Sequence, residues 1–382
     1  MTRIPEVSRR TFIGGLTTTL AGLERAPWAA SAAQNPRKRV PPQSMDYDRM
    51  AKLSFNENPY GPSEAVMEAM TGAFKYANRY GYPDGGIIEA IAEHHRLKPE
   101  NVLLGAGSSE LLKVADDTFL IDRKKVVGVD PTFGSVYLFA ANSRAEAIKV
   151  PLLPDFRMDI PGILRAVKSN YRDVGFVYLC NPNNPTGNII PKQEIRLLLD
   201  GIPGDVPVLI DEAYHHFVES PDYATSIPYI LEGRQVIVTR TFSKIAALAG
   251  MRLGYGLASR EMIERMSPFA NGSINAIVKW GGVAALRDTA AQARVRQNIL
   301  TLRKKVTGEL TALGYSVIPS EANFFMVHVR RNVAPVIEEF EKRGVQVGRI
   351  FPPMVEHLRV SVGTPEEMVR FMAAFKEIFR AA

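Results

Sequence analysis

The chain has 382 residues, of which 46% are hydrophobic, 23% charged and 9% aromatic, and this ordinary globular composition excludes a disordered, collagen-like or coiled-coil protein. The net charge is +7, from 47 basic and 40 acidic residues, and no basic block follows the N-terminal region, so nucleic-acid binding is disfavoured. The single cysteine, Cys180, excludes an intramolecular disulfide and a cysteine-rich metal site. This length exceeds what one compact core usually holds, which predicts two domains.

The first 33 residues have the order of a twin-arginine export signal. Arg9 and Arg10 precede a mildly apolar stretch, residues 12–23, and residues 30–32 then read as an A-x-A cleavage site. Glycines and threonines dilute the apolar stretch, so a stable membrane anchor is not expected. We expect residues 1–33 to be a removable signal that the twin-arginine export machinery recognises. The protein would then be periplasmic, or cytoplasmic if the signal is not used. The alternative is a tail or amphipathic helix that happens to contain two arginines.

Alternating strands and helices are expected after an extended N-terminal arm over residues 34–55. Short apolar runs rich in Val and Ile are typical of strands buried on both faces, and they occur at residues 102–105, 126–129, 174–180, 206–210 and 235–239. Helical patterns precede and separate these runs, at residues 64–76, 89–96, 110–120 and 192–199. This alternation predicts a large α/β domain with a mostly parallel central sheet over residues 56–273.

The pattern changes after residue 273 and predicts a smaller α+β domain over residues 274–382. A long helical stretch over residues 276–313 is followed by strand-like runs separated by helices. These runs lie at residues 316–318, 324–329, 345–347 and 358–362.

Polar motifs follow the predicted strands of the large domain, where an open α/β sheet places its ligands. Residues 105–110 form a glycine-rich turn that opens a helix and suits a phosphate, although a serine there could simply cap the helix. Residues 130–133 bring an aromatic ring that could cover a planar ligand or pack in the core. Residues 181–187 form a stiff turn with free amide side chains, and such turns are common without any function.

The next two strands lead into charged residues. Asp211 closes the apolar run at residues 206–210, and an unpaired carboxylate there would be expensive, so it must meet a cation or several donors. Lys244 follows the run at residues 235–239, and a lysine among apolar residues can have a lowered pKa that frees its amine for Schiff-base chemistry. A surface lysine is the ordinary alternative.

Together and in this order, the motifs resemble those of the fold-type I pyridoxal phosphate (PLP) enzymes, and within them the histidinol-phosphate aminotransferase-like branch. The resemblance covers about residue 52 to the end of the chain. It rests on residues 56–61, 107–109, 181–187, 211–214, 241–244 with Arg252, and 358–364. It implies the PLP-dependent transferase fold type I, an α/β fold in which a large domain with a mostly parallel central sheet is joined to a smaller α+β domain.

The resemblance also implies catalytic and cofactor-binding roles. Lys244 would hold PLP as a Schiff base and move the substrate proton, and Asp211 would pair with the pyridine nitrogen. Tyr214 and Asn184 would donate to the 3′ oxygen of the ring. The other expected cofactor contacts are the stacking ring of Phe133 and the phosphate contacts of Gly107, Ser108, Ser109, Thr241, Ser243 and Arg252.

Substrate and partner contacts follow from the same resemblance. Arg359 would bind the substrate α-carboxylate through a bidentate pair, with Asn323 and Asn58 as further substrate contacts. Tyr60 would reach the phosphate in a neighbouring subunit, which implies a homodimer with shared active sites.

The implied function is that of a PLP-dependent aminotransferase, or transaminase, which moves an amino group between an L-amino acid and a 2-oxo acid. Relatives specific for histidinol phosphate usually have an arginine directly after the valine of a Gly-x-x-Val segment, whereas Gly348 separates Val347 from Arg349 here. Together with the expected export, this difference favours another amino acid, aromatic or imidazole-bearing.

Two alternatives to an aminotransferase stay open. One is a PLP-dependent decarboxylase, lyase or cyclase of the same fold. The other is a non-catalytic periplasmic ligand-binding protein, which the retention of Lys244 disfavours. The adjacent histidine pairs at residues 94–95 and 215–216 fit no metal-binding pattern, so no metal site is expected.

Overall fold

The structure is a computed structural model, and it describes residues 47–380. The expected export signal, residues 1–33, lies outside the described residues. The chain divides into two units after Met50, and the described part of the first unit contains one short 3₁₀ helix, η2 (Tyr47–Arg49). All that follows concerns the second unit, which begins at Ala51. None of the helices described in it combines the length and the apolar character needed to cross a membrane.

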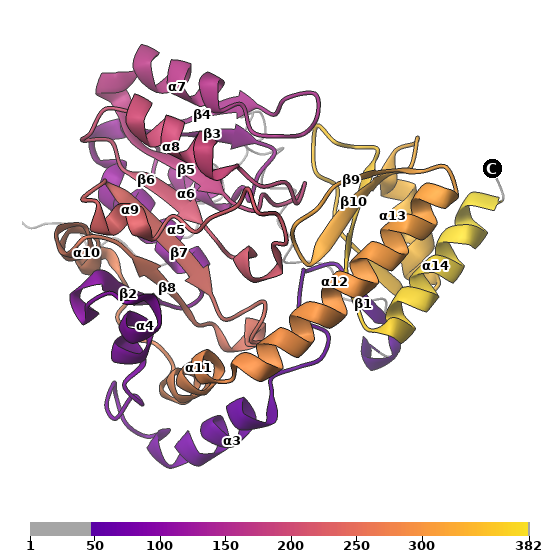
Figure 1. Ribbon diagram of the computed structural model, residues 1–382, viewed down its shortest axis with the longest axis horizontal. Coiled ribbons are helices and arrows are strands. Elements are labelled where there is room, and N and C mark those ends of the chain that lie inside the picture. Colours follow the sequence, from indigo (N-terminus) through magenta and orange to yellow (C-terminus); the bar gives the residue numbers. More distant parts are fainter. Residues whose placement is uncertain (1–46, 381–382) are drawn as a thin grey trace, which may run out of the picture. The chain divides into compact units, whose positions relative to one another are not determined.

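A seven-stranded sheet in the order β2-β8-β7-β6-β5-β3-β4 organises residues 102–257 (Figure 1). Its strands are Val102–Gly105 (β2), Lys125–Asp130 (β3), Ala147–Pro151 (β4), Val174–Cys180 (β5), Val208–Asp211 (β6), Val236–Thr241 (β7) and Gly254–Leu257 (β8). Only β8 is antiparallel to its neighbours β2 and β7. The sheet is therefore mostly parallel, as predicted. Every residue of β6 and β7 is buried, which confirms that their apolar runs belong to strands covered on both faces.

Helices connect and cover these strands, and in Figure 1 α8 and α9 lie in front of the sheet. Their bounds are Glu64–Ala73 (α3), Ile87–His95 (α4), Ser108–Phe119 (α5), Ser135–Asn142 (α6), Ile160–Ser169 (α7), Lys192–Gly201 (α8), Pro228–Leu231 (α9), Arg260–Met266 (α10) and Ala276–Arg287 (α11). The start of α7 illustrates how the sequence sets an end. Asp159 accepts a hydrogen bond from the Gly162 backbone N–H at 2.8 Å, and Pro161 occupies a first-turn position that needs no donor.

The helical stretch predicted over residues 276–313 is two helices rather than one. After α11, Asp288 adopts the non-helical angles φ −84° and ψ 62°, and α12 then runs over Thr289–Ala312. The Asp288 carboxylate accepts from the Ala291 backbone N–H at 3.0 Å. Asp288 therefore caps a new helix where the periodic pattern continues without a break.

The C-terminal elements form two small sheets. A three-stranded antiparallel sheet has the order β12-β10-β9, with strands Ser316–Ile318 (β9), Phe324–His328 (β10) and His357–Ser361 (β12). Strand β11 (Val345–Val347) pairs in parallel with β1 (Ala51–Leu53), so the end of the predicted arm is an ordered strand. Helices α13 (Val333–Lys342) and α14 (Pro365–Arg380) pack together through Phe340 and Phe371, whose rings stack with centres 5.4 Å apart.

Helix α12 links the two sets of elements (Figure 1). It contacts η7 (His215–Phe217), the short helix after β6, and it also contacts β9, β10 and α14. One long helix therefore touches both the loop that follows Asp211 and the C-terminal sheet.

Candidate active site

A cavity of about 210 Å³ lies where the predicted motifs meet. Strands β3, β5, β6 and β7 are parallel to one another. Strand β2 has the same direction, because both β2 and β7 are antiparallel to β8. The carboxyl ends of all five strands therefore lie at one edge of the sheet. The side chains around the cavity follow four of these strand ends and one N-terminal segment. They are Phe55, Glu57, Ser108, Ser109, Phe133, Asp211, Ala213, Tyr214, Thr241, Ser243, Lys244, Ala249 and Arg252.

Lys244 has the properties of an amine nucleophile. It follows β7, and its Nζ donates to the Phe55 carbonyl at 3.0 Å and lies 5.7 Å from the centre of the Tyr214 ring. Burial, and then the positive charge of Arg359, lower the pKa of Lys244 to about 8. A useful fraction of its amine is therefore neutral near neutral pH.

Asp211 is the last residue of β6 and is only 2% exposed. Its Oδ1 accepts from the Thr239 hydroxyl at 3.1 Å. Burial raises the pKa of Asp211 to about 6, and the hydrogen bonds from Thr239 and from the Ala213 backbone oppose that shift. A buried carboxylate with so few donors has the capacity to bind a protonated ring nitrogen.

A phosphate-sized cradle lies at the start of α5. Gly107 has a φ of +81°, and a Cβ on it would lie 2.0 Å from Nη2 of Arg252, so only glycine leaves room for the guanidinium. The Arg252 Nη1 donates to the Ser243 hydroxyl at 3.4 Å, and the Thr241 hydroxyl donates to Ser243 at 2.8 Å. A cation, two hydroxyls and the helix N-terminus at Ser108 together form an anion site.

These groups fit PLP. An amine, a carboxylate with spare acceptor capacity and an anion cradle line one cavity, and Phe133 lines it as well. The structure thus brings Lys244, Asp211, Phe133 and the predicted phosphate contacts together.

Tyr214 and Asn184 form part of a hydrogen-bonded chain that leads to Arg359. The phenol oxygen of Tyr214 accepts from Asn184 Nδ2 at 3.2 Å, and Arg359 Nη1 donates to Asn184 Oδ1 at 2.7 Å. Burial lowers the pKa of Arg359 to about 10, and its buried Nε has no partner within residues 47–380. The predicted substrate arginine and the predicted cofactor amide therefore touch directly.

The segment at residues 54–57 closes one side of the site through its backbone. The Ser54 carbonyl accepts from Arg359 Nη2 at 2.5 Å, and the next carbonyl, of Phe55, accepts from Lys244. Asn323 Nδ2 donates to the carbonyls of Asn56 at 3.0 Å and Glu57 at 3.3 Å. Four consecutive carbonyls thus hold three residues that the sequence singled out.

Asn323 and Asn58 brace this segment and do not line the cavity. The buried Oδ1 of Asn323 has no partner within the described residues. Asn58 Nδ2 donates to the Ile245 carbonyl at 2.9 Å, and its Oδ1 accepts from the Tyr60 backbone N–H at 3.0 Å. Direct contact of either amide with substrate stays a prediction.

Tyr60 lies away from the cavity that contains Lys244. It lines a second cavity of about 260 Å³, together with residues of α11 and α12. Its predicted contact, with the phosphate in a neighbouring subunit, involves a partner that the structure does not contain and stays a prediction.

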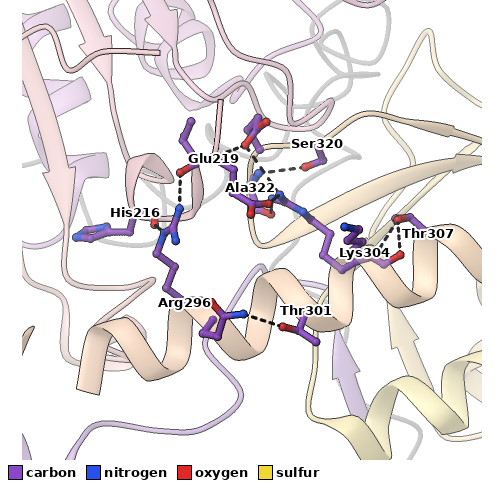
Figure 2. A network of polar contacts seen from close by, with 12 residues as sticks. His216, Glu219, Arg296, Thr301, Lys304, Thr307, Ser320 and Ala322 are labelled. Carbon is purple, nitrogen blue, oxygen red and sulfur yellow. Dashed lines mark hydrogen bonds and ion pairs between the residues drawn. The ribbon is translucent and has the colours of Figure 1, made fainter. Parts of the chain in front are cut away.

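A polar network from α12 fixes the loops on both sides of the site (Figure 2). Arg303 is 7% exposed, and it donates from Nη1 to the Ala322 carbonyl at 2.7 Å and from Nη2 to Glu219 at 3.1 Å. Two turns earlier, Arg296 donates to the carbonyls of residues 216 and 218 at 2.8 and 2.7 Å. The loop after Tyr214 and the loop that carries Asn323 are therefore tied to the same helix.

Several residues of the site were not assigned individually from the sequence. Phe55, Glu57 and Ala213 line the cavity, and Asn56 and Ser361 contact each other behind it. Asn56, Glu57, Ala213 and Ser361 all lie inside motifs that carried the family resemblance, so the motifs held the signal although no role followed from the residue types alone.

Comparison with known proteins agrees with the family resemblance of the sequence motifs. The family model "Aminotransferase class I and II" matches residues 48–375. A histidinol-phosphate aminotransferase of Moorella thermoacetica is 37% identical over 338 residues, which cover 86% of this chain and 85% of the relative. A second, from Halalkalibacterium halodurans, is 32% identical and covers 88% of this chain and 91% of the relative. The crystal structure of histidinol-phosphate aminotransferase from Sinorhizobium meliloti in complex with pyridoxal 5′-phosphate superimposes with a TM-score of 0.81 at 26% identity, over 87% of this chain and 91% of that one.

Proposed function

The chain belongs to the class I and II aminotransferase family and is a PLP-dependent aminotransferase, and from this premise we propose the roles of its residues and the class of its substrate. The observation that carries the residue roles is the convergence of Lys244, Asp211 and Arg252 on one cavity. When bound, PLP supplies an electrophilic carbon and a ring that withdraws electrons from the substrate.

The residues of the chain bind this cofactor and move the proton. Lys244 Nζ is the nucleophile and the proton carrier, because its lowered pKa leaves part of the amine neutral. Asp211 would hold the proton on the ring nitrogen. Arg252 would bind the phosphate, with the backbone and hydroxyl groups of Gly107, Ser108, Ser109, Thr241 and Ser243 around it, and Phe133 would stack on the ring.

The proposed substrate arginine, Arg359, does not line the cavity of about 210 Å³ itself, and it shares one phenyl ring with a second arginine, Arg349. The guanidinium carbon of Arg359 lies 4.6 Å, and that of Arg349 4.3 Å, from the centre of the Phe351 ring. Neither guanidinium forms an ion pair with a carboxylate of the described residues, and the charge of Arg349 disfavours that of Arg359. Arg359 is buried, so its lack of a carboxylate partner favours an anionic group of the substrate there, and the exposed Arg349 adds a second cation beside the same phenyl ring.

The glycine before Arg349 has a steric explanation. The Gly348 backbone N–H donates to the Arg359 carbonyl at 2.8 Å, and a Cβ on Gly348 would lie 2.7 Å from that oxygen. The displacement of the arginine by one position is therefore linked to close packing against Arg359. It does not remove the positive charge from the site.

We propose an anionic amino donor of the histidinol-phosphate type, with a 2-oxo acid as the acceptor. The named substrate of the curated relatives and the Arg349–Arg359 pair support this proposal. An uncharged aromatic or imidazole-bearing amino acid is the second candidate, which the altered Gly348-Arg349 spacing favours.

Steady-state kinetics with matched donors test the choice of substrate. We expect kcat/KM for histidinol phosphate to exceed that for histidinol, and Arg349→Gln to lower it about 10-fold or more while leaving histidine and phenylalanine little changed. Equal or better turnover of histidine or phenylalanine by the wild type would instead support the second candidate.

We further propose that the protein is a homodimer with shared sites and that residues 1–33 direct its export. Tyr60 is 37% exposed and does not line the cavity that contains Lys244, which supports a role toward a neighbouring subunit. The order of the twin arginines, apolar stretch and cleavage site supports export. Changing Arg9 and Arg10 to Lys should retain the uncleaved precursor in the cytoplasm. Normal processing of that variant would argue against a twin-arginine signal.

A further inference from the structure

Two buried amides meet on the phenol oxygen of Tyr214. Asn184 Nδ2 donates to it at 3.2 Å, and Asn56 Nδ2 donates to it at 3.1 Å. Asn56 and Tyr214 are both buried, and the edge-to-face packing of Tyr214 on Phe324, with ring centres 5.0 Å apart, fixes the ring. The oxygen of Tyr214 thus lies between two donors that come from different parts of the chain.

Strand β12 fixes the orientation of both amides. Arg359 and Ser361 are two residues apart on β12 and so face the same side of the sheet. Arg359 Nη1 donates to Asn184 Oδ1 at 2.7 Å, and the Ser361 hydroxyl donates to Asn56 Oδ1 at 3.0 Å. Because each amide oxygen accepts from β12, each amide nitrogen must face Tyr214.

The backbone of Asn56 supports this arrangement. Its φ is +54°, in the left-handed region that asparagine adopts more readily than most residues, and its backbone N–H donates to the Ser361 hydroxyl at 2.8 Å. Ser361 therefore accepts from the backbone of Asn56 and donates to its side chain, which leaves one orientation for the amide.

A phenol has one proton to donate and two positions at which it accepts. In Tyr214 both accepting positions are filled, by Asn56 and Asn184. The Tyr214 hydroxyl can then form a further hydrogen bond only as a donor. Tyr214 lines the cavity that also contains Lys244. Donors to the phenol oxygen also strengthen the bond that the phenol itself donates.

We propose that Asn56, held by Ser361, is a positioning residue that makes Tyr214 an obligate donor to the 3′ oxygen of PLP. The inference rests on PLP binding and not on the proposed substrate. Without Asn56 or Ser361, the phenol O–H could rotate away from the 3′ oxygen, or it could donate to the Oδ1 of an amide that has flipped. When the donor to the 3′ oxygen is weaker, the proton held between that oxygen and Lys244 Nζ is lost at a higher pH.

The pH dependence of the visible absorbance of bound PLP measures this effect without any substrate. We expect Asn56→Gly, which suits the positive φ, and Ser361→Ala each to move the absorbance transition upward by about half a pH unit. Tyr214→Phe should move it further in the same direction. In a protein that already carries Tyr214→Phe, adding Asn56→Gly or Ser361→Ala should not move the absorbance transition further, because both substitutions act through the phenol.

A matched control separates positioning from general destabilisation. Asn101 Nδ2 donates to the Ala258 carbonyl at 2.9 Å and has no contact with Tyr214, so Asn101→Ala should leave the transition unchanged. If Asn56→Gly does not retain PLP, Ser361→Ala alone decides. A transition at the wild-type pH in the PLP-bound variants, or a shift of equal size in the Tyr214→Phe background, would overturn the proposal.

Discussion

The guanidinium of Arg252 occupies the space that a side chain at Gly107 would need, since a Cβ there would lie 2.0 Å from Nη2. The arginine and the glycine come from segments 145 positions apart, and they meet because β2 and β7 both flank β8. This contact sets the width of the proposed phosphate site.

Gly107→Ala should therefore weaken PLP binding about 10-fold or more, because the new methyl group displaces the Arg252 guanidinium and because alanine resists a φ of +81°. Fluorescence titration of the apoprotein with PLP measures the affinity. A Cβ added at Gly308, in α12, would meet no neighbouring side chain within 4 Å, so Gly308→Ala is the control and should bind PLP like the wild type. Unchanged affinity in Gly107→Ala would contradict the assigned phosphate site.

Asp211→Asn should lower kcat at least about 100-fold while PLP stays bound, because an amide cannot hold a proton on the ring nitrogen as a carboxylate does. Turnover and the stoichiometry of bound PLP are measured on the same sample. Turnover close to that of the wild type would refute the role of Asp211.

Asp116 lies on α5 away from this chemistry and should limit stability. It is 1% exposed, both of its carboxyl oxygens lack partners within the described residues, and burial, then Asp117, raise its pKa to about 8. Its charged form is disfavoured in the folded state, so the penalty is absent at pH values below its unfolded pKa, grows as the pH rises and is complete above about pH 8.

Asp116→Asn should remove this penalty and raise the free energy of unfolding by about 1–3 kcal/mol at pH 8 to 9, with little gain at pH 4. Urea denaturation at several pH values measures the gain. Asp222→Asn, at an exposed aspartate outside α5, is the control and should leave the free energy of unfolding little changed. A gain that does not depend on pH would contradict the assignment of a raised pKa.

Arg303→Ala should destabilise the protein by about 1–3 kcal/mol, because it leaves the buried Ala322 carbonyl without its donor, whereas the exposed Glu219 carboxylate can bind water instead. It should also raise KM for the amino donor more than it lowers kcat, because Ala322 precedes Asn323 in the loop that braces residues 56–57. The neighbouring Lys304 is exposed, and Lys304→Ala is the control for both measurements. Equal stability of the two variants would show that the α12 network does not hold these loops.

Strands made of long apolar runs could be predicted from the sequence. The predicted strand at residues 174–180 coincides with β5, because seven consecutive residues suited to a buried strand leave little ambiguity. Strand β8 could not be predicted, since two of its four residues are glycines and its place between β2 and β7 comes from tertiary pairing. The pairing of β1 with β11 joins residues almost 300 positions apart and leaves no local signal.

In the site, too, some features could be predicted from the sequence and others could not. Lys244 and Asp211 could be predicted because each follows an apolar strand within a motif of known order. The contact of Asn56 with Tyr214 could not, because it depends on how a segment before the large sheet folds back across 158 positions. The break at Asp288 was missed because an aspartate can either cap a helix or lie on its exposed face.

The half-reaction without a 2-oxo acid tests the central claim most directly. Purified PLP-bound protein is mixed with a single amino donor, and the visible absorbance of the cofactor is followed together with the keto product. We predict loss of the PLP absorbance with one equivalent of keto product per active site, recovery of the absorbance on addition of a 2-oxo acid, and neither change in Lys244→Ala. Continuous release of carbon dioxide with the PLP absorbance unchanged, or an equal reaction in Lys244→Ala, would contradict an aminotransferase that works through Lys244.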